Sequence, residues 1–282
     1  MAKQEIYQAR ASAERAMAVA KAVSPFVIEV RFLGGLTATQ QAAFRAAADR
    51  WTTMIVGDLP SVRVDNEVID DVLILAQGAP IDGPGRILGQ AGPTHLRPAA
   101  AGKAAYLPAK GIMSFDTADL AKMEADGTLN DVITHEMGHV LGIGTVWSQK
   151  NLLKGATGSN PTFAGSGAMT AYKALRVASR RRRVPVENTG GPGTRGSHWR
   201  ETVFRNELMS GFIAAPGNPL SRLTVASLAD LGYEVDLAAS EPYALPDLMA
   251  LAEAGALVAH EAPVNLGMVL PIIPQVLPSD GL

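Results

Sequence analysis

Alternating apolar and polar positions predict several strands in the first half of the chain. Residues 26–32 (FVIEVRF) alternate in their second half, and residues 71–76 (DVLILA) form a short apolar run that is typical of a buried strand. Residues 111–116 (GIMSFD) predict another strand, which we expect at the sheet edge, where an extended substrate could pair with it. Residues 78–95 are rich in glycine and proline and predict a loop or an edge hairpin.

Helical spacing of apolar residues, preceded by capping residues, predicts three helices. Thr37 or Thr39 can cap a helix that runs to about residue 56. A second helix should begin near Asn130, a good N-cap, and end near Gly142. A third is expected over residues 221–231.

The N-terminal stretch, residues 1–23, is alanine-rich and charged throughout. It predicts an amphipathic helical arm with Ile6, Ala13 and Met17 on or near one face. A short inhibitory pro-segment is the functional alternative, in which Glu5 or Glu14 would cap a metal. The stretch lacks the continuous apolar run of a secretory signal peptide, so export by a non-classical route stays open and the localisation is not predicted.

The strongest chemical signal is the run HEMGH at residues 135–139. Residues four apart lie on one face of a helix, so His135 and His139 can aim their rings at one metal ion. Glu136 lies beside that face, where it can accept a proton from a metal-bound water. A helix that carries these residues by accident is the competing reading, and it is weakened by Gly142, which can end the helix in a left-handed turn.

The third metal ligand is displaced from its usual place. The motif HExxHxxGxxH asks for a third histidine where this chain has Thr145. A nearby carboxylate ligand is excluded, because residues 137–186 contain no Asp or Glu. The next histidine is His198, with Glu187 and Glu201 as the alternatives.

Three segments of the chain resemble the leishmanolysin-type metallopeptidases, which are metzincins with a long insertion before the third zinc histidine. These segments are HEMGHVLGIG, VPVENTGGPGTRGSHW and NELMSGF, and the resemblance extends over roughly residues 25 to 245. It implies one catalytic zinc ion bound by His135, His139 and His198, with Glu136 as general base. It also implies that Met209 is the methionine of a turn below the metal. The absence of cysteine, in contrast to eukaryotic members, favours a bacterial-type member.

The resemblance and the predicted elements together give an α+β, metzincin-like catalytic domain. We expect a twisted mixed sheet and the active-site helix in an upper lobe, and an irregular, partly helical lower lobe with the methionine turn. The predicted divisions are the arm at 1–24, the N-terminal lobe at 25–144, the C-terminal lobe at 145–245 and a tail of unknown role at 246–282.

Composition narrows the functional classes. Hydrophobic residues make up 47% of the chain and charged residues 18%, as in a folded globular protein. The net charge of −2 argues against nucleic-acid binding, and no apolar stretch is long enough to span a membrane. The oligomeric state is not predicted.

These observations favour a zinc endopeptidase that acts on polypeptides. The alternative is a catalytically silent zinc-binding module used for protein binding or adhesion, but such a structural site has no need of a base such as Glu136. The oxyanion-stabilising group stays unassigned: Gly211 stands where some metzincins have a tyrosine, and Tyr233 is more typical of a core aromatic.

Overall fold

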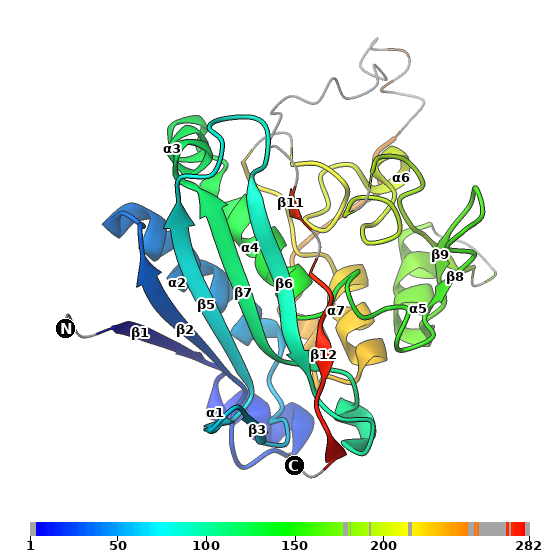
Figure 1. The fold of residues 1–282 in the computed structure, drawn as a ribbon. Helices are drawn as coiled ribbons and strands as arrows, with labels where there is room; N and C mark the ends of the chain where they lie inside the picture. Colours follow the sequence, from blue (N-terminus) through cyan, green and yellow to red (C-terminus); the bar gives the residue numbers. More distant parts are fainter. Residues whose placement is uncertain are drawn as a thin grey trace.

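A computed structural model describes residues 4–176, 180, 182–191, 193–213, 216–247, 251, 253, 269–270 and 272–279. The main element is a seven-stranded sheet with six strands in the order β1-β2-β5-β7-β6-β11, and β12 also pairs with β6 (Figure 1). The strands are β1 (Glu5–Arg10), β2 (Val27–Gly34), β5 (Val72–Ala79), β6 (Gly89–Leu96), β7 (Pro108–Asp116), β11 (Val269–Leu270) and β12 (Gln275–Val276). Strands β2, β5 and β7 are parallel to one another, whereas β1 is antiparallel to β2 and β6 is antiparallel to β7, so the predicted mixed sheet is confirmed.

Two helices pack behind this sheet, α2 (Ala38–Met54) and α4 (Leu129–Val140) (Figure 1). Helix α2 begins at a capping box in which Thr37 and Gln40 each bond the other's backbone N–H, at 3.2 and 3.0 Å. Its buried Phe44 ring packs against Phe32 of β2 and Phe115 of β7. The helices and the inner sheet face thus share one core, with α3 (Thr117–Asp126) at the end of β7.

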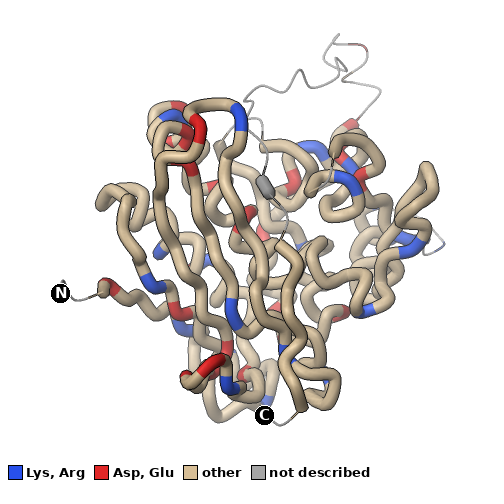
Figure 2. Tube along the Cα trace, in the orientation of Figure 1, with Lys and Arg blue, Asp and Glu red and all other residues tan. Residues whose placement is uncertain are grey.

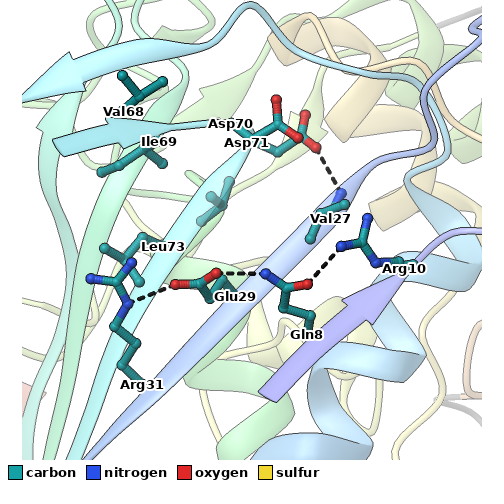
Figure 3. A pocket seen from close by; sticks show the side chains of 11 residues that line it. Gln8, Arg10, Val27, Glu29, Arg31, Val68, Ile69, Asp70, Asp71 and Leu73 are labelled. Carbon is teal, nitrogen blue, oxygen red and sulfur yellow. Dashed lines mark hydrogen bonds and ion pairs between the residues drawn. The ribbon is translucent and has the colours of Figure 1, made fainter. Parts of the chain in front are cut away.

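The opposite face of the sheet carries a row of polar side chains, which explains the alternation in the sequence. Glu29 of β2 accepts hydrogen bonds from Arg31, at 2.6 Å, and from Gln8 of β1, at 2.7 Å (Figure 3). Arg10 donates in turn to Gln8. The small hairpin of β3 (Val62–Val64) and β4 (Glu67–Ile69) borders this surface, where Glu67 pairs with Arg31.

The second half of the chain forms a smaller body that flanks α4. It contains a three-stranded sheet and the packed helices α5 and α7, on the right in Figure 1. Its elements are β8 (Leu153–Lys154), β9 (Thr162–Phe163), α5 (Ser166–Leu175), β10 (Val184–Pro185), α6 (Glu201–Phe204) and α7 (Arg222–Leu231). An aromatic cluster joins the ends of the long insertion: Trp147 lies 4.9 Å from Trp199 and 5.1 Å from Phe163, measured between ring centroids.

Several local predictions are confirmed and others are wrong. Helix α7 lies where a helix was expected, over residues 221–231, and the structure adds that the Ser221 side chain caps it. Helix α4, however, begins at Leu129, so Asn130 lies inside the helix and is not its cap. The strand predicted at 111–116 exists as part of β7, but it lies between β5 and β6 and not at the edge. The Gly- and Pro-rich stretch becomes a loop followed by strand β6, which is antiparallel to β7.

The helical prediction for the N-terminal arm is also wrong in part. Residues 5–10 are strand β1, because the edge of β2 offers them a complete antiparallel partner. Only the short α1 (Ala13–Arg15) and a π-helical turn at Ala16–Ala20 are helical. Glu5 pairs with Arg45, at the sheet edge opposite to β6, which does not fit a role as a metal cap.

Two 3-10 turns, Gly102–Ala104 and Leu237–Ala239, complete the described elements. Across the described ranges, no helix is both long and apolar enough to cross a membrane. Figure 2 shows acidic and basic positions distributed over both halves of the trace, in keeping with the net charge of −2. The domain limits at 144/145 and 245/246 stay predictions.

Candidate metal centre

Helix α4 brings two histidine rings together in the interior. The Nε2 atoms of His135 and His139 lie 3.1 Å apart, and each residue is only 5–6% exposed. His135 Nδ1 lies 2.6 Å from the carbonyl oxygen of Leu208, and His139 Nδ1 lies 2.8 Å from that of Ile143. Because a carbonyl can only accept, both Nδ1 atoms carry the proton, and both Nε2 lone pairs face the shared point.

Two glycines after α4 turn the chain toward the third histidine. Gly142 and Gly144 have φ values of +105° and +76°, a backbone conformation that favours glycine. A Cβ on Gly144 would lie 2.0 Å from the carbonyl oxygen of Ser197, so only glycine permits this approach. Thr145, at the usual third-ligand position, instead donates to the His139 carbonyl at 2.7 Å. The close approach of Gly144 to Ser197 brings the segment around His198 next to α4.

His198 completes a triangle of ring nitrogens. Its Nε2 lies 3.0 Å from that of His135 and 2.9 Å from that of His139. Its Nδ1 lies 2.9 Å from the Thr194 carbonyl, which fixes the same tautomer as in the other two rings. The backbone beside it is held by a bond from Trp199 N–H to the Met209 carbonyl. The structure therefore brings together all three histidines that the sequence analysis selected.

The surroundings keep these rings neutral. Burial lowers the pKa of His135 to about 3 and that of His139 to about 4, and it holds the pKa of His198 well below its usual range. Three converging lone pairs with no proton between them repel one another unless a cation lies at their centre. This donor set fits a zinc ion, which binds imidazole nitrogens at about 2.0–2.1 Å.

Glu136 lies on the same helix and is also buried, at 6% exposure. Within the described part of the chain, its Oε2 atom has no hydrogen-bond partner. Burial alone raises the pKa of this carboxyl to about 8, and a cation held by the three histidines would lower that pKa again and favour the carboxylate form. A buried carboxyl with an unpartnered oxygen is costly, which is typical of functional sites rather than of structural cores.

Met209 lies in the turn that also supports His135 through the Leu208 carbonyl. Its thioether packs against Gly138 of α4, so closely that a Cβ on Gly138 would lie 2.8 Å from the sulfur. The backbone N–H of Met209 donates to Glu207 at 2.7 Å. This turn therefore supports both His135 and the helix that carries His135 and His139.

Two supporting residues escaped the sequence analysis. Glu207 is fully buried and accepts hydrogen bonds from Ser221 and Thr224 at the start of α7, as well as from the Met209 N–H. Trp51 of α2 donates to the Thr134 carbonyl of α4 at 2.9 Å. Glu207 could have been recognised from its position two residues before Met209. No local sequence pattern marks Trp51 as a partner of α4.

Other candidates are placed elsewhere. Tyr233 is 2% exposed and donates to the Leu141 carbonyl, as expected for a core aromatic. The Glu187 carboxylate accepts hydrogen bonds from backbone N–H groups, including that of Glu201. Neither glutamate belongs to the histidine cluster found among the described residues.

Comparison with known proteins gives a consistent result. The family model described as Leishmanolysin matches residues 100–245, just over half of the chain. Leishmanolysin of Leishmania major is 29% identical over 142 residues, which cover 48% of this chain and 23% of that protein. The Leishmania donovani protein is 28% identical over 142 residues, covering 48% and 24% of the two chains. A leishmanolysin homolog of Crithidia fasciculata is 28% identical over 133 residues, covering 45% and 20%.

The matched region thus spans at most about a quarter of the curated relatives' own length. It includes the whole histidine cluster, the insertion and the Met209 turn. The expected family is confirmed, whereas the bacterial-type assignment stays a prediction. On the family match and its extent, the chain belongs to the leishmanolysin peptidase family.

Proposed function

We propose that this protein is a zinc-dependent endopeptidase that hydrolyses peptide bonds in polypeptide substrates. The observation that carries the proposal is the convergence of three neutral, buried Nε2 atoms, two of them on the helix of Glu136, whose Oε2 has no hydrogen-bond partner among the described residues. One zinc ion held by these nitrogens would supply Lewis-acid chemistry, which lowers the pKa of a bound water to about 7 and polarises a carbonyl.

The residues of the chain divide the remaining work. Glu136 takes a proton from the attacking water, and the resulting oxygen nucleophile forms the new bond to the carbonyl carbon. As the C–N bond breaks, Glu136 returns that proton to the leaving amine, so the proton balance closes. The carbonyls of Leu208, Ile143 and Thr194 hold the three rings in the ligand tautomer throughout. We further propose that Met209 is the methionine below the metal, without binding it.

The test compares Glu136→Ala and His198→Ala with the wild-type chain. Glu136→Ala should keep one zinc per chain, measured by metal analysis, and lose cleavage of casein or gelatin. His198→Ala should lose most of its zinc as well. Retained cleavage in Glu136→Ala would refute the mechanism. Wild-type protein that binds zinc but cleaves no member of a peptide library would instead indicate a silent zinc-binding module.

A further inference from the structure

Strand β6 is the sheet strand that borders the metal centre on the side away from β1. Helix α4 packs against β6 and β7. A Cβ on Gly111 of β7 would lie 2.4 Å from Val140 Cγ1 and 2.9 Å from the Gly92 carbonyl of β6. Val140 directly follows the ligand His139. Gly111 thus lies between the β6 backbone and Val140, so β6 runs next to the helix that carries the site. The outer edge of β6 is where an extended peptide could add as a strand.

The chain's own C-terminal segment occupies that edge. Strand β11 pairs in parallel with residues 89–90, and β12 pairs in parallel with residues 95–96. The Leu277 N–H donates to the Leu96 carbonyl at 2.9 Å. Between the two strands, Ile272 lies against Gly92, where a Cβ would be 3.6 Å away. Figure 1 shows the segment descending along β6 on the side that faces α7.

One side chain anchors this segment. Leu277 is 7% exposed and packs in a small apolar cluster beside the sheet. Its neighbours there are Val62, Val64, Ile69, Leu73 and Ala109. Ile273, by contrast, is 95% exposed and contributes no burial. Strands of two residues are short, and Pro274, next to β12, has no N–H to donate, so the pairing itself is weak.

We propose that the described residues 269–270 and 272–277 act as an autoinhibitory strap that competes with extended peptide substrates for the edge of β6. The inference rests on the proposed function, because it takes β6 as the substrate-binding edge of that peptidase. The strap backbone fills the space along this edge, beside carbonyls such as that of Leu96, so an extended substrate cannot pair with the same residues of β6 at the same time. Since the strap is part of the same chain, it competes at an effective concentration on the order of millimolar. It therefore raises KM and leaves kcat unchanged.

The test uses Leu277→Asp in the full chain, with Ile273→Asp as the matched control. Both changes add one charge to the strap, but only the first removes its anchor. Burial of a leucine corresponds to a factor of about ten to one hundred in an equilibrium constant. Leu277→Asp should therefore lower KM for an extended peptide about tenfold or more at constant kcat. Ile273→Asp should behave as wild type. A synthetic peptide with the sequence of residues 269–277 should inhibit Leu277→Asp competitively.

A second measurement separates the strap from the catalytic mechanism. In the Glu136→Ala background, binding of a fluorescent extended peptide is measured with and without Leu277→Asp, so no turnover is needed. Tighter binding with Leu277→Asp supports the strap, whereas equal dissociation constants overturn it. Loss of the proposed function shows separately, as absence of cleavage by chains that retain Glu136.

A reversible disulfide between the strap and β6 provides a second test that does not depend on the folding of Leu277→Asp. The chain has no cysteine, so His95→Cys with Gln275→Cys, which are direct partners between β6 and β12, places the only two thiols in register. Oxidation should suppress cleavage of extended peptides, and reductant should restore it, while either single variant stays unaffected. An oxidised double variant that cleaves as fast as its reduced form also overturns the proposal.

Discussion

Gly138→Ala tests the packing between the active-site helix and the turn below it. A Cβ at this position would lie 2.8 Å from Met209 Sδ and 2.9 Å from Trp51 Cζ2. Ordinary contacts between such atoms are about 3.5–4.0 Å, so the new methyl group overlaps two fully buried side chains. Alanine favours a helix over glycine by about 1 kcal/mol, but overpacking costs about 1–3 kcal/mol. Because the methyl group overlaps two side chains at once, we take the upper part of the overpacking range, about 2–3 kcal/mol, and expect a net destabilisation of about 1–2 kcal/mol.

The assay is urea denaturation of the metal-free protein, followed by zinc titration of the folded variant. Zinc affinity should fall as well, because displacing Met209 moves the adjacent Leu208 carbonyl that holds His135. Gly191→Ala is the control, since a Cβ there meets no atom within 4 Å and the backbone is unstrained. If Gly138→Ala is as stable as the wild type or more stable, helix propensity outweighs packing and the reasoning fails.

Three further outcomes are expected. The pKa of Glu241 is lowered: burial raises it, but the hydrogen bonds from Arg50, at 2.6 and 2.7 Å, outweigh burial. This carboxylate therefore stabilises the fold at pH values above its unfolded pKa, and that stabilisation is lost as pH falls through its lower folded pKa. Glu241→Gln should flatten the acid side of a stability–pH curve measured by urea denaturation. An unchanged slope would contradict this. Trp51→Phe should lower stability by about 2 kcal/mol or more, because it removes the indole hydrogen bond to the Thr134 carbonyl and leaves a gap in the core; an unchanged melting temperature in a thermal melt would refute that role. A chelator should lower the melting temperature of the wild type but not of His198→Ala, and equal shifts would show that the metal lies elsewhere.

The parts of this fold that could be predicted are those determined by residues close to one another in the sequence. Helix α2 was located by a candidate cap, Thr37 or Thr39, because a cap is satisfied by a residue about three positions away, and α7 by the spacing of its apolar residues. The pair of His135 and His139 was predictable for the same reason. His198 was not: 59 residues separate it from His139, and only the family resemblance singled it out from the two glutamates.

The wrong predictions concern partners that the local pattern does not contain. Residues 5–10 have a composition that suits a helix, but they form a strand because they pair with the edge of β2. The position of β7 inside the sheet depends on β6, which precedes it along the chain yet lies outside it. The supporting contact of Trp51 with Thr134 crosses 83 positions and has no sequence signature.

The aromatic cluster at the ends of the insertion has an evolutionary consequence. Trp147 and Trp199 pack against each other, with their rings tilted by 31°, where the insertion leaves and rejoins the site, and Val186 pairs with Trp199 in an antiparallel bridge. Because these contacts fix both ends, the exposed turn between β8 and β9, residues 155–160, can change length without moving His198. Doubling such a loop costs only about 0.6 kcal/mol of closure entropy. Selection can therefore lengthen, shorten or recharge this surface segment while the metal-binding geometry stays under separate constraint.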